Sequence, residues 1–420
     1  MAGTFVGTER TTPERVLDTA AMLFWEKGYA ATTTREIAAA VGIQQASLYY
    51  HVASKEDLLY QLCVSSMERL LADVGSALGV AVDPKERVRV FIHAHLTGLL
   101  QQQIRHVNIL TELRALSKPH HKEVLALRKD YAELARSILA AGQSAGVIRA
   151  DIPAKYLYLA LLNVLNWAVV WFRREEALGA EQLAELFYLI YMDGSAAFPG
   201  RIHPKLPGFA NREAKTAARG RRPPLAVRKN TSQRLVDAAA SLFSRTGYEA
   251  TSTREIASAL GIQKASLYYH IGSKEELLLA ICQSSLEQIR GDVEAGISAV
   301  LDPLQRISAL VSAHIESMLR DQEKHSVAVA EMHLLSPGPF AEVRRSRDAY
   351  EGLVRSVLQE AQDAGVLRAD IPVKYLCLGL LGLMNRVEVW YRRNGALSPG
   401  EFGQLLAALY LTGAASRPQD

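Results

Sequence analysis

Apolar residues recur three or four positions apart through most of the chain, which is the spacing of one face of an α-helix. The first such stretch runs from Thr12 to Gly28 and opens with a cap residue, a proline and an acid, the preferred order at a helix start. A matching stretch runs from Thr231 to Gly247. No segment alternates apolar and polar residues like a strand, and no hairpin signal occurs. The pattern predicts an all-α fold.

One stretch of the chain occurs twice. Thr33 to Leu59 is repeated from Ser252 to Leu278 without insertion or deletion, an offset of 219 residues. The first copy predicts a helix from Thr34 to Ala40 and another from Gln44 to His51. Gly42, between them, can adopt the positive φ of a sharp turn. Two short helices around a tight turn are typical of a helix-turn-helix unit.

The starts of these helices carry capping signals. Thr33 and Glu36 stand three residues apart, as in a capping box, and Ser54 and Asp57 repeat the spacing at the start of a third helix. This third helix is expected to continue past Met67 and to join the small unit to a larger helical body.

The second helix of the repeat is crowded with hydrogen-bonding side chains: Gln44, Gln45, Ser47, Tyr49, Tyr50 and His51. Amide, hydroxyl and aromatic donors suit base edges and phosphates. In the alternative, Leu48 and one tyrosine fill a local three-helix core and the remaining residues are solvated. We accept this alternative for Leu48 and expect the polar set to face DNA.

At these residues both copies resemble the DNA-binding domain of the TetR family of bacterial transcription regulators. The most specific signature is S-L-Y-Y-H followed by S-K-E-x-L-L. The resemblance implies a DNA-facing set in each copy. In the first copy it comprises Thr33, Thr34, Arg35, Gln44, Gln45, Ala46, Ser47, Tyr49, Tyr50, His51 and Lys55. In the second copy it comprises Ser252, Thr253, Arg254, Gln263, Lys264, Ala265, Ser266, Tyr268, Tyr269, His270 and Lys274.

The repeat extends beyond these heads, since nearly identical segments begin at Gly146 and Gly365. We therefore expect two TetR-like units fused in tandem. The helix-turn-helix domains are predicted at 1–60 and 231–279, helical ligand-binding and dimerisation domains at 61–198 and 280–420, and a linker at 199–230. TetR-like regulators usually work as homodimers whose last two helices form a four-helix bundle. The resemblance implies that the two halves pair in this way within one chain, as a pseudo-dimer.

The bodies are predicted to be helical throughout. Asp83 and Pro84 break the chain before an apolar pattern that keeps helical spacing from Val88 to Leu116. A last amphipathic helix is expected from Ala180 to about Ala197. The apolar stretch from Tyr156 to Phe172 is at the lower limit of membrane-spanning length. Its repeat partner contains Arg386 and Glu388, so we interpret both as buried core helices and expect no membrane contact.

Charge and cysteine content narrow the class of protein. The net charge is +4, but the linker alone carries nine basic residues against Glu213. Only three cysteines occur, Cys63, Cys282 and Cys377, too few for a disulfide framework. The amino terminus lacks an apolar segment of signal-peptide length. We expect a cytoplasmic, DNA-associated bacterial protein.

The end of the apolar helix carries a second resemblance. Trp171-Phe172-Arg173-Arg174, matched by Trp390-Tyr391-Arg392-Arg393, is similar to a branch of the family that senses acyl-coenzyme A intermediates of steroid or fatty-acid breakdown. It implies a repressor whose body binds a small-molecule effector, an acyl-CoA, that weakens DNA binding by changing the spacing of the heads. The expected pocket residues are Arg114, Tyr158, Asn163, Trp167, Trp171, Met384 and Trp390. The alternative is that the aromatic residues are only core.

No enzyme motif competes with this interpretation. There is no Gly-rich phosphate loop, no nucleophile elbow and no metal-ligand spacing shared by both copies. We therefore expect no catalytic residue, no metal and no cofactor. The rival hypothesis is a DNA-bound adaptor of the same fold, such as a nucleoid-occlusion factor, whose body binds a protein partner. A closed apolar pocket would favour the sensor, and an exposed apolar patch the adaptor.

Overall fold

The computed structural model describes residues 12–173, 178–194, 231–385, 387, 391–392 and 395–413. Only the backbone is described at Val107, Ile109, Leu110, Thr111, Thr231, Lys264 and His270. Every regular element in these ranges is helical. The predicted linker and the pocket candidate Trp390 lie outside the described residues.

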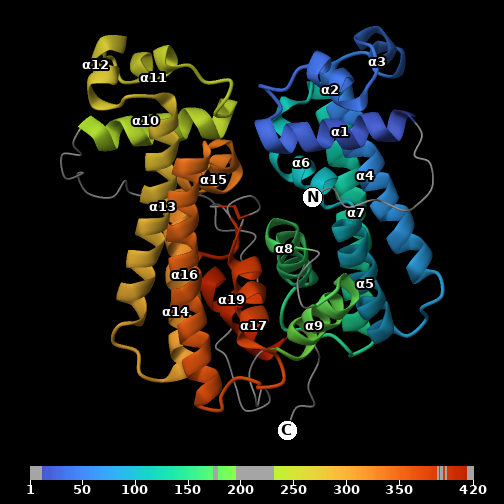
Figure 1. Cartoon of the computed structure of the whole chain (residues 1–420). Helices are drawn as coiled ribbons and strands as arrows, with labels where there is room; N and C mark the ends of the chain where they lie inside the picture. Colours follow the sequence, from blue (N-terminus) through green and yellow to red (C-terminus); the bar gives the residue numbers. More distant parts are fainter. Residues whose placement is uncertain are drawn as a thin grey trace.

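The first half contains ten helical elements in the described ranges. They are α1 (Thr12–Lys27), α2 (Thr34–Val41), α3 (Gln45–His51), α4 (Lys55–Leu78), α5 (Pro84–Gln101), α6 (Gln103–Thr111), the 3-10 helix η1 (Leu113–Ala115), α7 (Lys118–Ser144), α8 (Ala154–Trp171) and α9 (Ala180–Asp193). The first three and the start of α4 form the head, and the remainder forms the body (Figure 1).

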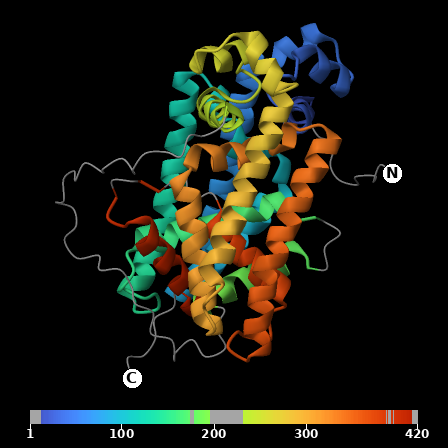
Figure 2. The ribbon, with the colours of Figure 1, turned by 90° about the vertical axis from the view of Figure 1, so that its left-hand side faces the viewer.

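The second half repeats this order. Its elements are α10 (Thr231–Thr246), α11 (Thr253–Ala259), α12 (Lys264–His270), α13 (Lys274–Ile297), α14 (Pro303–Arg320), α15 (Gln322–Glu331), the 3-10 helix η3 (Met332–Leu334), α16 (Pro337–Asp363), α17 (Val373–Met384) and α19 (Pro399–Thr412). Figure 2 shows the long α13, in yellow to gold, descending from the second head alongside α14 and α16.

Local signals account for the helices of the heads. The Thr33 hydroxyl accepts from the Glu36 amide while the Glu36 carboxylate accepts from the Thr33 amide, which completes the predicted capping box. Gly42 ends α2 with φ +79°. The Ser54 hydroxyl accepts from the amide of Asp57, but the Asp57 carboxylate accepts from Ala53, one residue earlier than a capping box requires.

Three predicted helices differ from the structure by more than one residue. The pattern from Val88 to Leu116 is not one helix, because Gln102 leaves the helical region with φ −116° and ψ 33°. This break lets the Gln103 amide donate to the carbonyl oxygens of Val169 and Phe172 at the end of α8. The last helix of the first half ends at Asp193, because Gly194 adopts φ +80° and ψ −177°.

The third difference concerns the two apolar helices, which are not equally long. α8 runs to Trp171, whereas α17 ends at Met384, six residues before the matching position. Asn385 is extended there, with ψ 149°. The two copies therefore diverge at the helix that the sequence proposes as the pocket wall.

The halves contact each other where α8 crosses α17, and α9 also touches α17 and α19 (Figure 1). Two contacts are related by the repeat. The Arg149 guanidinium donates to the carbonyl oxygen of Gly413, and that of Arg368 donates to the carbonyl oxygen of Gly194. Arg149 and Arg368 are 219 positions apart, and so are Gly194 and Gly413. Because each half makes the same contact to the other, the two halves face each other about a pseudo-twofold axis.

By length and composition alone, α8 could cross a membrane, with a mean hydropathy of 1.2. In the structure it packs on α5 and α7 of its own half and on α17 of the other. Leu157, Leu161 and Leu165 are buried in these contacts. This packing is that of a core helix, as the sequence indicates.

Candidate nucleic-acid interface

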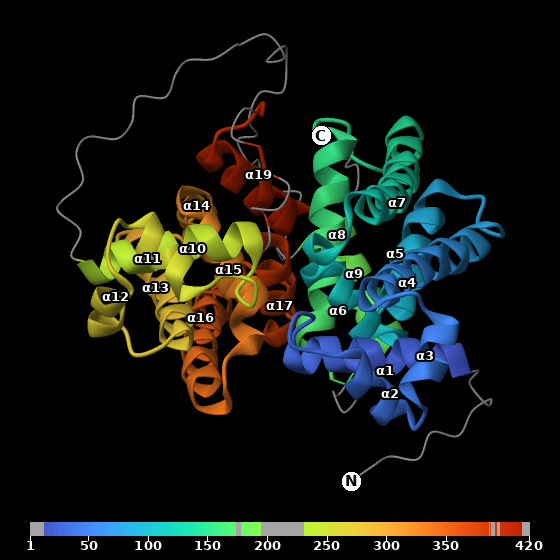
Figure 3. The same cartoon turned by 90° about the horizontal axis from the view of Figure 1, so that it is seen from above.

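The two heads lie at the same end of the molecule. In Figure 1 the short helices α3 and α12 are both at the top, each beside the helix that precedes it in the motif. Figure 3, seen from above, places them on opposite sides of the seam between α8 and α17. One face of the molecule therefore presents both second helices of the repeats.

The first head separates its buried and exposed residues as the polar pattern predicts. Leu48 is fully buried in the head core. Tyr50 is 90% exposed and Tyr49 is 48% exposed, so neither tyrosine fills that core. The predicted core role of Leu48 is confirmed, while the exposed rings of both tyrosines face solvent.

Hydrogen bonds connect the two short helices across the exposed face. The Gln45 amide donates to the hydroxyl of Thr34, and the Thr34 and Tyr49 hydroxyls lie 3.1 Å apart. In the second head Thr253 and Tyr268 make the equivalent contact at 3.2 Å. These bonds hold the polar side chains in a fixed arrangement on the surface.

The remaining DNA-facing candidates of the first head also lie at or near its surface. Thr33, Arg35, Gln44, Ala46 and Ser47 are exposed, and His51 is half-buried at the end of α3. In the second head the exposed candidates are Arg254, Gln263, Ala265, Ser266, Tyr268 and Tyr269, with Ser252 exposed at the start of α11.

Lys55 occupies a different kind of position. Its ammonium group donates to the carbonyl oxygens of Tyr29, Ala30 and Thr32, and lies 4.4 Å from the centre of the Tyr29 ring. Lys274 repeats the arrangement in the second head. Because an ammonium has three N–H donors, these bonds occupy all of them. The lysine ties the loop between α1 and α2 to the start of α4, and its contact with DNA stays a prediction.

The charge at the start of α2 is also fixed by contacts. Glu36 accepts from Lys27 at 2.8 Å as well as from Thr33, and these bonds lower the pKa of its carboxyl to about 2. The carboxylate remains ionised and satisfies the helix start, which leaves Arg35 beside it as an exposed cation.

Contacts between the halves that the sequence analysis did not predict lie just below the heads. Trp25 of α1 stacks on His333 of η3 with ring centres 4.9 Å apart. On the other side Arg114 of η1 forms an ion pair with Glu331. Arg114 and His333 are the same position of the repeat, and their unlike chemistry is the one signal that could have pointed to this junction.

The expected pocket residues do not share one cavity in the described part of the chain. Arg114 lies at the junction below the heads, Trp167 is buried against α17, and Met384 is buried in the second body. Tyr158 is half-buried under Arg136, whose guanidinium carbon lies 5.7 Å from the ring centre. The remaining described candidates, Asn163 and Trp171, each have a buried side-chain nitrogen without a hydrogen-bond partner.

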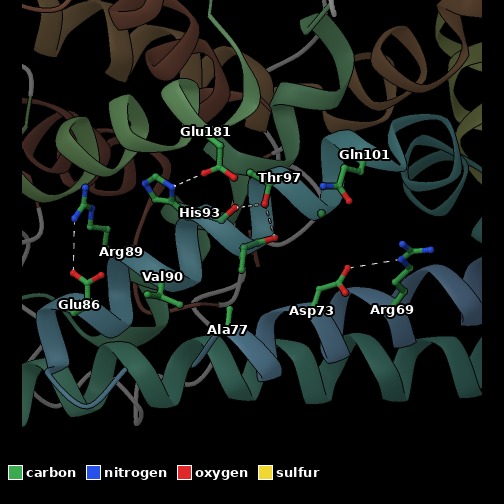
Figure 4. A pocket seen from close by; sticks show the side chains of 12 residues that line it. Arg69, Asp73, Ala77, Glu86, Arg89, Val90, His93, Thr97, Gln101 and Glu181 are labelled. Atoms are coloured by element: carbon green, nitrogen blue, oxygen red, sulfur yellow. Dashed lines mark hydrogen bonds and ion pairs between the residues drawn. The ribbon is translucent and has the colours of Figure 1, made fainter. Parts of the chain in front are cut away.

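Open clefts lie elsewhere on the described part of the chain. One, of about 560 Å³, runs between α4, α5 and α9, and its charged residues pair with each other, as His93 does with Glu181 (Figure 4). Another, of about 770 Å³, lies between α10, α13 and the α14–α15 corner and contains the ion pair Lys324–Asp321. None of the six expected pocket residues that the structure describes lines either cleft.

The buried histidines of the bodies are structural. His95 lies 2.5 Å from the hydroxyl of Tyr131, and the corresponding His314 lies 2.6 Å from that of Tyr350. Burial lowers the pKa of both imidazoles to about 3, so they are neutral at physiological pH. Among the described residues no group of three or more potential ligands could hold a metal ion.

The paired motifs and their exposed polar helices define the class of the molecule, a DNA-binding protein of the helix-turn-helix type. Comparison with known families places it more closely. The family "Bacterial regulatory proteins, tetR family" matches residues 16–62 and 235–281, and "Tetracyclin repressor-like, C-terminal domain" matches residues 81–195 and 300–414. The chain belongs to the TetR family and carries both of its domains twice.

Individual relatives match one half of the chain. The HTH-type transcriptional repressor KstR2 of Rhodococcus jostii (strain RHA1) is 29% identical over 185 residues, which cover 43% of this chain and 90% of that protein. The solved structure of the ketosteroid transcriptional regulator KstR2 of Mycobacterium tuberculosis is 27% identical, with a TM-score of 0.41, covering 44% of this chain and 95% of that one. AibR, solved with isovaleryl coenzyme A and operator DNA, is 26% identical, with a TM-score of 0.40, covering 43% and 97%.

Proposed function

We propose that the chain represses transcription by holding both heads on one DNA operator. The observation that carries this proposal is the presence of two helix-turn-helix units at the same end of one molecule, each with an exposed polar second helix. The relative named as a repressor, of which the match covers 90%, supports repression. Such a regulator acts on DNA in the cytoplasm.

The DNA-facing residues of this proposal are the two sets expected from the sequence. The exposure of Tyr50 and Tyr269 and of the neighbouring polar residues supports their contact with DNA. Arg35 and Arg254, exposed near the starts of α2 and α11, would bind phosphate or a base edge.

The working unit in this proposal is the single chain, paired half to half. The reciprocal contacts of Arg149 with Gly413 and Arg368 with Gly194 support the pairing. A tether makes such pairing intramolecular, at an effective concentration of roughly millimolar. The heads would then reach successive major grooves, roughly 34 to 36 Å apart on one face of DNA.

For the effector we propose an acyl-coenzyme A thioester bound in the body. This step rests on the sequence ending Trp171-Phe172-Arg173 and its likeness to the acyl-CoA-responsive branch. The unpartnered nitrogens of Asn163 and Trp171 support a polar ligand near this part of α8. Binding would change the distance between the heads and release the operator.

The experiment is footprinting on the DNA that flanks the protein's own gene. A protected site spanning two major grooves, lost on adding acyl-CoA thioesters but retained with free coenzyme A, is the expected result. Protection of one groove only would contradict joint binding by the heads. Small-angle scattering of the free chain should give one compact particle at low concentration, and two separated lobes would contradict the pairing.

The adaptor hypothesis predicts another outcome. It requires an apolar patch on the body for a protein partner. The relative named as a transcriptional repressor favours the regulator. Protection that is insensitive to every thioester tested, together with unchanged expression of the adjacent genes on deletion, would favour the adaptor instead.

A further inference from the structure

The halves do not present the same surface to each other where α8 crosses α17. A Cβ atom placed on Gly382 would lie 3.1 Å from the Cα of Val164 and 3.3 Å from the Cβ of Trp167. These distances are shorter than ordinary van der Waals contacts, so a side chain at Gly382 would force Val164 and Trp167 of α8 to give way. Trp167 itself is buried, with 8% of its surface exposed. The indole therefore packs where the other helix has only a hydrogen atom.

The corresponding positions carry different residues in the opposite half. Gly382 of the second half corresponds to Asn163 of the first, and Trp167 corresponds to Arg386. If a second copy of α8 replaced α17, Asn163 would stand where only glycine fits. This pairing of two first halves is overpacked by a whole side chain.

The pairing of two second halves fails for another reason. If a second copy of α17 replaced α8, no indole would fill the space that Trp167 occupies, because α17 ends at Met384, before the position that matches Trp167. The interface would lose a large apolar side chain and leave a cavity. Each like pairing is thus disfavoured, by overpacking in one case and by lost packing in the other.

One contact of the seam is made in the same way by both halves. Arg149 and Arg368 both donate to the carbonyl oxygen at the glycine that follows the last helix of the opposite half. Both halves carry this arginine and this glycine, so any pairing could form these bonds. Arg149 donates in addition to the hydroxyl of Thr412, whose counterpart in the first half is Asp193. Where α8 crosses α17, the selective contact is the one between Trp167 and Gly382.

We propose that Trp167 and Gly382 form a complementary pair that restricts each half to a partner of the other kind. The inference rests on the half-to-half pairing proposed above. In this proposal the first body binds the second body, and neither body binds another copy of itself. When two chains meet, the first half of one could pair with the first half of the other only by breaking this fit.

The test begins with the folded full-length chain carrying a protease site within residues 199–230, cut after purification. Light and isotope-labelled cut proteins are mixed in urea below the unfolding transition, and their complexes are weighed by native mass spectrometry. Mixed-label pairs of one first and one second half are expected, with like pairs below about a hundredth of the total. All three kinds of pair near a 1:2:1 ratio would overturn the inference while leaving pairing intact. Separate fragments without any pairs would overturn the pairing itself.

Matched variants keep the test decisive if the fragments do not exchange. Gly382→Asn and Gly379→Ala each give α17 the residue that α8 has at the matching position. A Cβ on Gly379 would lie 3.6 Å from the Ile190 side chain, an ordinary contact, so this variant is the control. After cutting, Gly382→Asn should weaken association of the halves at least 100-fold relative to Gly379→Ala. Equal association of the two variants would overturn the proposal.

A gain-of-function variant tests the same contact from the other side. Asn163→Gly gives α8 both the indole and the glycine, so first halves become able to pair with each other. Asparagine and glycine are both poor helix formers, which limits the cost to the helix. Pairs of first halves should then appear in the spectrum, at least tenfold above wild type. Their continued absence in mixtures that exchange normally would contradict the assignment of selectivity to Trp167 and Gly382.

Discussion

Arg114 of the first half donates to the carboxylate of Glu331 in the second half, and the same carboxylate accepts from the amide of Tyr248 in the second head, at 3.4 Å. Glu331 is buried. One carboxylate thus connects a turn of one body to the head carried by the other, directly below the DNA-facing surface. A shift of one body relative to the other would therefore change the distance between Arg114 and Glu331, and through Glu331 it would act on the second head.

Removing Arg114 should destabilise the chain. Arg114→Ala leaves the buried Glu331 carboxylate without its cation, which should lower the free energy of unfolding by roughly 2 to 3 kcal/mol. The control is Arg69→Ala, which breaks an exposed pair with Asp73 and should cost less than about 0.5 kcal/mol. Urea titration measures both. If the ion pair is responsible, adding Glu331→Gln to Arg114→Ala should recover part of the loss.

Stability should also depend on pH through Glu112, which is the position of the repeat that matches Glu331. Burial, and then the negative charge of Glu331, raise the pKa of Glu112 to about 7, and Glu249 adds to this while Arg114 and Lys55 oppose it. The folded chain then holds a proton that the unfolded chain releases near pH 4.5. Stability is therefore greater below that pH and is lost as the pH rises to about 7.

The corresponding variant is Glu112→Gln. In the wild-type chain the free energy of unfolding should decline by roughly 2 to 4 kcal/mol between pH 5 and pH 8. The variant should lack this decline. Exposed Glu294→Gln is the control and should keep the wild-type decline. Equal pH profiles for Glu112→Gln and wild type would show that another group is responsible.

Variants of Lys55 and Arg35 should distinguish a residue that stabilises the head from a residue that contacts DNA. Lys55→Ala removes the donor to three carbonyl oxygens of the loop, so it should lower the stability of the first head by about 1 to 3 kcal/mol and weaken DNA binding as a consequence. Arg35→Ala changes an exposed cation and should weaken DNA binding without lowering the melting temperature. Melting curves and binding isotherms for both variants check this, and a stable Lys55→Ala protein that fails to bind would instead assign the lysine to DNA.

The operator should be asymmetric, because Gln45 of the first head is replaced by Lys264 in the second. Glutamine can bond adenine N6 and N7, whereas lysine favours guanine O6 and N7, with discrimination of about 1 to 3 kcal/mol. Lys264→Gln should therefore shift the preference to a symmetric operator. If Lys264 binds phosphate instead, the variant should weaken all operators alike and reduce the salt slope by about one. Binding to symmetric and asymmetric operators at two salt concentrations distinguishes the two results.

The heads were predictable because their signals are local. The capping spacing of Thr33 with Glu36 and the glycine at Gly42 lie within a few residues of the helix ends that they define. The contact of Arg114 with Glu331 was not predictable, since its residues are 217 positions apart. For the same reason the sequence assigned Arg114 to a pocket, whereas the structure places it at the junction below the heads.

The two copies of the repeat differ most clearly at their apolar helices. Trp167 and Arg386 stand at equivalent positions of the repeat, but the sequence analysis expected the two apolar helices to fold alike, whereas α17 is shorter than α8. The single sequence could not predict that α8 would cross α17 at Gly382, because the fit depends on the angle between two helices from opposite halves. Helix ends follow from neighbouring residues, but contacts between helices follow from shape.

The presence of both heads on one chain also changes how the regulator responds to its own abundance. For a homodimer that dissociates at low copy number, operator occupancy rises with the square of the subunit concentration, and the response has a threshold. For this chain, with its halves joined, occupancy rises with the first power of concentration. A cell that carries few copies, or that has just divided and halved them, would lose repression in proportion rather than abruptly.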